Sequence, residues 1–296
     1  MKIHVVFRTC DAVFSLHDVG RPFGLSKPEV IRLCFKSLIT ALEGIDHSVH
    51  VQGDRLSAEM MGFFKEYGVS ISNQDLGNDE SIRQSLSRAY GRADDEWVYL
   101  CEDDYLHSPE AFQVVQDLVE NREAVLRNRP RNPLLFGRRI PRPLVIHPAD
   151  YPDRYLPHKR KATLLYVSNL AHWREITNTT FTFLAEGRTF KRFKGIFDRS
   201  ASGADDRYLS HNLYGNRSLR RRALCLSPIP GVATHMHQGV MTPRVDWEAI
   251  YETARSGVDS RTSPEVHARS DLPCSPVEPP LRISTTSSVG LQPTGD

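Results

Sequence analysis

Three adjacent carboxylates, Glu102-Asp103-Asp104, are the most informative feature of the sequence. They follow the largely apolar segment 97–101, which is predicted to be a buried strand, and apolar residues resume after them. Mutual repulsion and desolvation make such a triplet costly at the end of a buried strand unless a cation lies there. Mg²⁺ or Mn²⁺ bridging to phosphate oxygens would be a suitable cation. A solvated turn is the alternative, and the triplet alone does not decide between the two.

Two later clusters offer side chains for the same chemistry. Asp205 and Asp206 follow Gly203 and open a predicted helix, where carboxylates either stabilise the first turn or present a general base to a cleft. His235 and His237 lie two positions apart in a predicted extended segment, so both point to one face. They are candidate metal ligands or two partly exposed histidines, and the acidic triplet elsewhere makes an imidazole ligand more credible.

The elements that must position these residues alternate along the first part of the chain. Strands are predicted at 3–7, 47–52, 69–72 and 97–101, and helices at 28–43, 57–67 and from Asp79 or Ser81 to Tyr90. This order, with short connections, predicts the α/β class: a mostly parallel central sheet with helices on both faces. Such sheets bind ligands at the carboxyl ends of their strands. We therefore expect a set of polar residues at these ends to converge: Arg8, Thr9, Asp11, Asp54 and the acidic triplet.

The pattern is less regular after the triplet. A helix is predicted at 108–127, a strand at 163–167 and a second helix at 173–185. The tail, 256–296, contains Ser, Thr and Pro with few large apolar residues and is expected to be disordered.

Basic and aromatic residues of this second part are candidates for binding a ligand. Basic side chains gather at 127–133, at Arg138, Arg139 and Arg142, and at 158–161, where they form either a solvated loop or a groove for an anion. Trp173 and Trp247 are candidates for stacking on a ring of a ligand, with buried packing as the alternative.

Composition narrows the class of protein without naming an activity. The 296 residues carry a net charge of +2, too small to indicate nucleic-acid or membrane binding by itself. No apolar run is long enough for a transmembrane segment, and residues 1–7 indicate a strand rather than a signal peptide. The five cysteines are scattered and form no CxxC pair, so we expect reduced cysteines in a cytoplasmic protein. Neither GxGxxG nor GxxxxGK(S/T) occurs where a dinucleotide or P-loop fold would need it.

In motif order and spacing, the chain resembles the GT-A-fold glycosyltransferases, the group that includes the inverting family 2 enzymes. Glu102-Asp103-Asp104 corresponds to the DxD-type motif, Asp205-Asp206 to the ED-type motif that supplies the base, and His235 to a late histidine. The resemblance implies one GT-A-like domain at 1–255, with a nucleotide-binding half at about 1–107 and a smaller acceptor-side, catalytic region at about 108–255. Glutamate at the first acidic position and Asp-Asp in place of Glu-Asp depart from the family pattern.

The resemblance also implies a function, transfer of a sugar from a nucleotide-diphosphate sugar to a hydroxyl acceptor with inversion. Asp104 with His235, or with His237, would hold Mn²⁺ or Mg²⁺ against the diphosphate. Arg8, Thr9, Asp11 and Asp54 would line the base and ribose pocket, and Glu102 or Asp103 would contact ribose or metal-bound water. Asp206 would be the base, with Asp205 as the alternative, and Arg83 would either reach phosphate or lie at the surface.

Two other functions remain open at this point. A metal-dependent hydrolase or nucleotidyltransferase would keep the metal and act on phosphate, although two-metal chemistry usually needs more carboxylates at one centre. A non-catalytic sugar- or nucleic-acid-binding module would use the arginine-rich region, with metal-independent and salt-sensitive binding. For the transferase, the acceptor could be a polysaccharide, a lipid, a protein or modified DNA.

Overall fold

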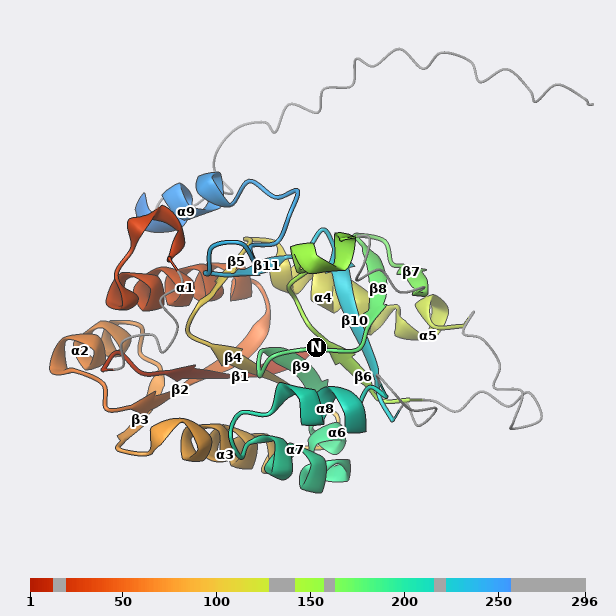
Figure 1. Cartoon of the computed structure of the whole chain (residues 1–296), viewed down its shortest axis with the longest axis horizontal. Coiled ribbons are helices and arrows are strands. Elements are labelled where there is room, and N and C mark those ends of the chain that lie inside the picture. The colour runs from red at the N-terminus through yellow and green to blue at the C-terminus, as the bar shows by residue number, and fades with distance from the viewer. Residues whose placement is uncertain (13–19, 128–141, 157–162, 216–221, 257–296) are drawn as a thin grey trace, which may run out of the picture. The chain divides into compact units, whose positions relative to one another are not determined.

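The computed structural model describes residues 1–12, 20–127, 142–156, 163–215 and 222–256, which are coloured in Figure 1. Within these ranges the strands are β1 (Lys2–Thr9), β2 (Asp46–Asp54), β3 (Ser70–Gln74), β4 (Trp97–Glu102), β5 (Tyr105–His107), β6 (Leu144–Ile146), β7 (Leu165–Val167), β8 (His172–Ile176), β9 (Phe183–Glu186), β10 (Leu224–Ile229) and β11 (Ala233–His235). Nine of them form one sheet in the order β3-β2-β1-β4-β9-β6-β10-β8-β7, and β11 pairs with β5 in a second, small sheet.

The central sheet is mixed and mostly parallel. β1 pairs in parallel with β2 and β4, and β2 with β3, so the first four strands of the chain form a continuous parallel block. β9 runs antiparallel to both β4 and β6, β10 is parallel to β6, and β8 is antiparallel to β10 and β7. Seven of the nine strands therefore point the same way, with β9 and β8 reversed. This is the mostly parallel α/β sheet that the sequence predicts.

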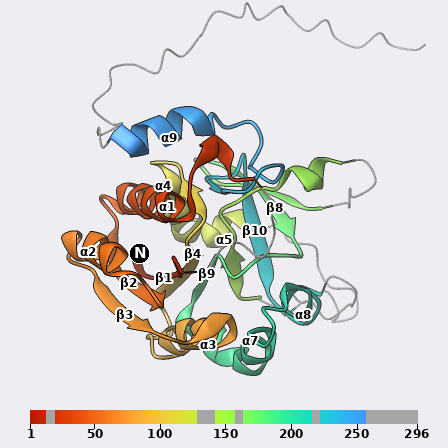
Figure 2. The ribbon, with the colours of Figure 1, turned by 60° about the vertical axis from the view of Figure 1, so that its left-hand side comes forward.

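Helices cover both faces of this sheet (Figures 1 and 2). The α-helices of the described ranges are α1 (Lys27–Leu42), α2 (Ala58–Glu66), α3 (Gly77–Tyr90), α4 (Ala111–Glu120), α5 (Arg122–Val125), α6 (Gly187–Arg192), α7 (Lys194–Ser200), α8 (Asp206–Asn212) and α9 (Trp247–Ser256), and short 3₁₀ turns lie at Pro22–Gly24 and Pro152–Tyr155. α1, α2 and α4 pack on one face, and α3, α6, α7 and α8 on the other.

Alternation along the buried strands explains the two layers. On β1, Ile3, Val5 and Phe7 belong to the apolar cluster on the α1 face, whereas Val6 belongs to the cluster on the α3 face. Successive side chains of a strand point to opposite faces, so a strand with helices on both faces must be apolar throughout. The run of apolar residues in β1 and β4 is the sequence signal for this burial.

The small sheet brings a late segment of the chain to the end of β4. β11 pairs antiparallel with β5, which places His235 opposite Tyr105 and Ala233 opposite His107. Met236, Leu106 and Trp247 share a third apolar cluster with residues of α1. This packing holds 233–256 against α1, next to the carboxyl ends of the parallel strands.

The helix predicted at 173–185 is wrong, because this region contains β8 and β9. Between them lie Thr177, Thr179, Thr180 and Thr182, whose β-branched side chains disfavour a helix. Phe183–Glu186 is buried along its whole length between β4 and β6, where an extended chain completes the ladder. Tertiary pairing therefore determined the structure of this segment.

Smaller corrections follow from local contacts. The helix predicted at 108–127 is interrupted at Asn121, which separates α4 from α5. α3 begins at Gly77, before the expected caps Asp79 and Ser81. The indole N–H of Trp173, which is fully buried, donates to Ser168 Oγ, and that of Trp247 donates to the Thr242 carbonyl. Neither tryptophan is available to stack on a sugar.

Several predictions fall outside the ranges that the structure describes. They concern the tail from 257 onward and the basic residues within 128–141 and 157–162; of the arginines named individually above, Arg142 is described and partly buried. Among the described helices, none has the length and apolar character needed to cross a membrane.

Candidate functional site

A pocket of about 280 Å³ opens where β1, β2 and β4 end. It is lined by Arg8, Thr9, Cys10, Arg21, Lys27, Val30, Asp54, Arg55, Asn78, Ser81, Glu102, Asp103, Asp104, Met236 and His237. The polar strand ends predicted to converge therefore meet here, except Asp11. Cationic and acidic side chains face the same space, which suits a ligand that carries phosphates and a divalent cation.

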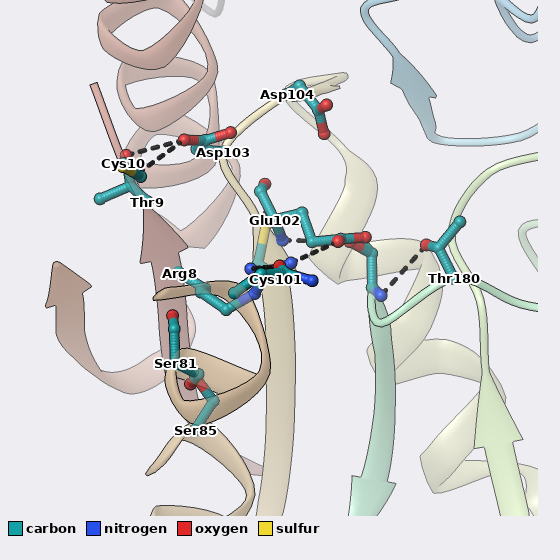
Figure 3. Close-up of polar contacts among 12 residues, drawn as sticks. Arg8, Thr9, Cys10, Ser81, Ser85, Cys101, Glu102, Asp103, Asp104 and Thr180 are labelled. Atoms are coloured by element: carbon teal, nitrogen blue, oxygen red, sulfur yellow. Dashed lines mark hydrogen bonds and ion pairs between the residues drawn. The ribbon is translucent and has the colours of Figure 1, made fainter. Parts of the chain in front are cut away.

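The three carboxylates of the triplet have different partners (Figure 3). Glu102 forms an ion pair with Arg8, with Nη2 and Oε1 2.6 Å apart, and Thr182 Oγ1 lies 3.3 Å from its second oxygen. Arg8 also donates to the side-chain oxygen of Asn78 at 3.0 Å. Glu102 is therefore held at the end of β4 by one residue of β1 and by one that precedes β9.

Asp103 is buried and points toward the end of β1. Its carboxylate accepts hydrogen bonds from Thr9 Oγ1 at 2.8 Å and the Cys10 amide at 3.2 Å, and Lys27 Nζ lies 2.5 Å from its other oxygen. Burial would lower the pKa of Lys27, but Asp103 and Asp104 outweigh that effect and raise it. Asp103 thus fastens β1 and α1 to the turn after β4.

Asp104, the last residue of the triplet, has one carboxylate oxygen in a hydrogen bond and one without a partner among the described residues. One of its oxygens, Oδ2, lies 2.9 Å from His235 Nε2, and the other, Oδ1, is buried without a hydrogen-bond partner among the described residues. Burial opposes ionisation of Asp104, yet His235 and Lys27 lower its pKa below the ordinary value. The same pair acts in reverse on His235, since Asp104 outweighs burial and raises the pKa of the imidazole.

Asp104, His235 and His237 could hold a metal ion, because their donor atoms all lie within 4.8 Å of one another. The His235 ring stacks on Tyr105, with centroids 5.1 Å apart and planes at 11°, and on His237 at 4.7 Å and 14°. The Met236 amide donates to the Asp104 carbonyl at 2.7 Å, which fixes the two segments together. One carboxylate with an unused buried oxygen and two imidazoles fit a divalent cation.

Asp205 and Asp206 open a helix, α8, as predicted. Asp205 is its N-cap and accepts the Tyr208 amide at 2.9 Å. Asp206 follows with a pKa raised to about 7, first by burial and then by the negative charges of Glu102 and Asp205. Arg8 and His235 act on it in the opposite direction. The pKa of Asp206 therefore responds to the charge of Glu102, although the two residues lie far apart in the sequence.

The remaining predicted residues lie in different places. Asp54 lines the pocket, and its Oδ1 accepts the Leu76 and Gly77 amides at 2.8 and 3.2 Å, which ties the end of β2 to the start of α3. Asp11 does not line the pocket; it accepts hydrogen bonds from the amide and hydroxyl of Ser57, the N-cap of α2.

Arg83 was expected either at phosphate or at the surface, and it does not line the pocket. Its guanidinium lies 3.4 Å from Glu80 and donates to Ser202 Oγ at 2.9 Å, in the loop before Asp205. The partly exposed side chain thus joins two segments of the protein itself.

Sequence reasoning missed five polar pocket residues, Arg21, Lys27, Arg55, Asn78 and Ser81. A signal existed for Lys27: it is the first residue of α1, where the helix dipole disfavours a cation unless an anion lies nearby. Arg55 has a positive φ of 52°, which is uncommon for a side chain of this size but is not visible in the sequence.

Comparisons with known proteins give likeness of fold at low identity. No family model matches the sequence, and no curated protein matches it. A crystal structure of residues 1–349 of S. aureus TarS is 15% identical, with a TM-score of 0.41 over 77% of this chain and 60% of that one. The galactosyltransferase LgtC is 12% identical (TM-score 0.39, 86% and 95% covered), and a nucleotidyl transferase from Methanothermobacter is 11% identical (TM-score 0.41, 86% and 99% covered). This chain therefore spans less than two thirds of the TarS fragment.

Proposed function

We propose that the protein is a metal-dependent glycosyltransferase that moves a sugar from a nucleotide-diphosphate sugar to a hydroxyl group, with inversion. The observation that carries this proposal is the pocket at the strand ends, where Asp104 and His237, two of the candidate metal ligands, line the same space as Arg8 and Lys27. Asp206, whose pKa is raised to about 7 by burial, supplies a candidate base. A general base works best when its pKa lies near the operating pH. Asp206 has this property, and it belongs to an element separate from the pocket that would hold the donor.

The donor pocket would bind the nucleotide through the ends of β1 and β2. Asp54 lies there with Arg55, and Arg8, Arg21 and Lys27 supply positive charge for phosphate oxygens. Asp104, His235 and His237 would hold the divalent cation, which would neutralise charge on the leaving diphosphate. Two imidazoles among three ligands are a poor match for Mg²⁺, which is usually bound through carboxylates and keeps several waters, and leave Mn²⁺ as the better of the two candidates.

Asp206 would accept the proton of the acceptor hydroxyl. As the proton moves to the carboxylate, the hydroxyl oxygen forms a bond to the anomeric carbon, and the bond from that carbon to the diphosphate oxygen breaks with its electron pair. Attack from the face opposite the leaving group inverts the configuration. Asp205 is the weaker candidate for this role because its carboxylate already accepts the Tyr208 amide as the N-cap of α8.

A panel of donors tests the proposal. The purified protein is incubated with UDP-, GDP- and TDP-sugars, with Mn²⁺ or with EDTA, and mass spectrometry follows the nucleotide products. Release of a nucleoside diphosphate in the presence of Mn²⁺, but not in the presence of EDTA, supports the transferase. In a parallel incubation with nucleoside triphosphates and sugar phosphates, release of pyrophosphate would instead identify a nucleotidyltransferase. Metal-independent binding without turnover would indicate a binding module.

A further inference from the structure

Helix α3 touches both the donor pocket and the loop that carries Asp206. At its start, Asn78 lines the pocket and accepts from Arg8, the partner of Glu102. The next residue, Asp79, accepts the Gly203 amide at 2.8 Å through Oδ2. One turn later, Arg83 donates to Ser202 Oγ at 2.9 Å. Neighbouring positions of α3 therefore contact both the donor pocket and the loop before Asp206.

The contacts of α3 with the 198–203 segment lie along one face of the helix. Asp79, Arg83 and Tyr90 are spaced by four and seven residues, which is the spacing of a helical stripe. Tyr90 donates to Asp198 Oδ1 at 2.7 Å, at the far end of this stripe. Ile82 and Leu86 of α3 share an apolar cluster with Ala201 and Leu209, so packing beneath the polar contacts joins the same segments.

The loop between α7 and α8 is held both by its own hydrogen bonds and by α3. Gly203 and Ala204 both have positive φ, 74° and 48°, a conformation disfavoured for alanine. Within the loop, the Asp205 amide donates to the Ser200 carbonyl at 2.7 Å and the Asp206 amide to the Ala204 carbonyl at 3.0 Å. The Gly203 amide donates to Asp79 of α3 instead. Helix α3 therefore fixes the loop three residues before Asp206.

We propose that Asp79 and Arg83 are positioning residues that hold the loop before α8 and thereby fix the position of the Asp206 carboxylate. This inference rests on the proposed function of Asp206. The two residues act through the loop and do not contact the reacting atoms. A shift of about 1 Å in a catalytic group can lower turnover by about 100-fold, whereas donor affinity depends on the pocket and would be retained.

Matched variants of Asp79 separate a positioning role from general stability. Asp79→Ala removes the acceptor of the Gly203 amide, whereas Asp79→Asn keeps an acceptor oxygen. Arg83→Ala removes the bond to Ser202. Tyr90→Phe is the control, because it removes a hydrogen bond between α3 and Asp198 of α7, outside the loop.

Two measurements decide the inference. Hydrogen exchange of the free protein should show faster exchange of the Gly203 amide in Asp79→Ala, and near-normal exchange in Asp79→Asn and Tyr90→Phe. Turnover of UDP-glucose, GDP-mannose and TDP-glucose with Mn²⁺ should show kcat reduced by roughly 10- to 100-fold in Asp79→Ala and Arg83→Ala, with donor KM nearly unchanged. Asp79→Asn should recover most of kcat.

The outcomes distinguish this inference from the proposed function. An active wild type with undiminished kcat in Asp79→Ala and Arg83→Ala would overturn the positioning role alone. Unchanged exchange at Gly203 in Asp79→Ala would also overturn it, whatever the activity. A wild type that releases no nucleotide from a full donor panel would contradict the proposed function, and with it any positioning role in catalysis.

Discussion

The imidazole Nε2 of His235 lies 2.9 Å from Oδ2 of Asp104, although 131 positions separate the two residues in the chain. The contact joins the turn after β4 to β11, and the opposite shifts in the two pKa values keep the carboxylate ionised beside the ring. A cation that displaced the proton of His235 could use both atoms as ligands. Several consequences of this arrangement can be measured.

Removal of any proposed ligand should weaken metal binding. Asp104→Ala and His235→Ala should each reduce the affinity of the free protein for Mn²⁺ by about 10-fold or more, because each removes one of three donors. His237→Ala tests the third. Isothermal titration calorimetry measures the change, with Glu248→Ala on exposed α9 as a control. Unaltered Mn²⁺ affinity in Asp104→Ala would exclude this metal site.

Asp206→Asn should abolish most turnover and leave donor binding intact. Loss of a general base lowers rates by roughly 10²- to 10⁴-fold. Asp205→Asn is the matched comparison, since asparagine is also a good N-cap and the cap of α8 should survive. Steady-state kinetics and Mn²⁺-dependent nucleotide binding are measured for both variants. If Asp205→Asn lost activity while Asp206→Asn kept it, the two assignments would be reversed.

Turnover should rise with pH through about 7. The pKa of Asp206 is raised to about 7, so its carboxylate is protonated below that pH and cannot accept the hydroxyl proton. The rate at low donor concentration should therefore increase up to about pH 7 and level off above it. A pH–rate profile of kcat/KM gives the apparent pKa. A profile that is flat between pH 5 and 8 would contradict a base of this kind.

The same carboxylate should make stability depend on pH. A folded-state pKa above the unfolded value means that the folded protein holds the proton more tightly, so raising the pH from about 4 to 7 destabilises it. Asp206→Asn carries no such charge. Its stability relative to wild type should increase by about 1–2 kcal/mol between pH 5 and pH 8, allowing for the partial exposure of Asp206. Urea unfolding at the two pH values measures the difference.

Asp103 should matter for folding more than for metal binding. Asp103→Ala leaves Thr9, the Cys10 amide and Lys27 without their shared acceptor at a buried position. The expected loss is about 2–4 kcal/mol of the free energy of unfolding. Asp95→Ala, at an exposed carboxylate before β4, should cost little. Equal losses in the two variants would show that the Asp103 contacts do not stabilise the fold.

The parallel block could be predicted from the sequence because its signals are local. Apolar runs such as Val5-Val6-Phe7, separated by helices with glycine stops, indicate buried strands, and the topology then brings Arg8, Asp54 and Glu102 to one edge. The acidic triplet, the carboxylates opening α8 and the late histidines were therefore visible as separate clusters. That these three clusters lie close together is a prediction that follows from the order of the strands.

The rest depended on tertiary contacts. Phe183–Glu186 is a strand because β4 and β6 pair with it on both sides, and its own sequence also suits a helix. The ion pair between Lys27 and Asp103 requires α1 to start beside the turn after β4. The spacing of residues in the sequence does not show that the two segments are neighbours. Arg83 faces Ser202 rather than the pocket for the same reason, since its direction depends on the packing of α3 against α7 and α8.

The pairing of β11 with β5 has a consequence for the order in which the site matures during synthesis. A ribosome that has released the chain only as far as β10 has already delivered Asp104 and all four strands of the parallel block, but neither imidazole. Because two of the three proposed ligands are still missing, Mn²⁺ affinity would stay low until His235 and His237 emerged. Metal uptake would thus report synthesis of the chain through His237, just beyond β11.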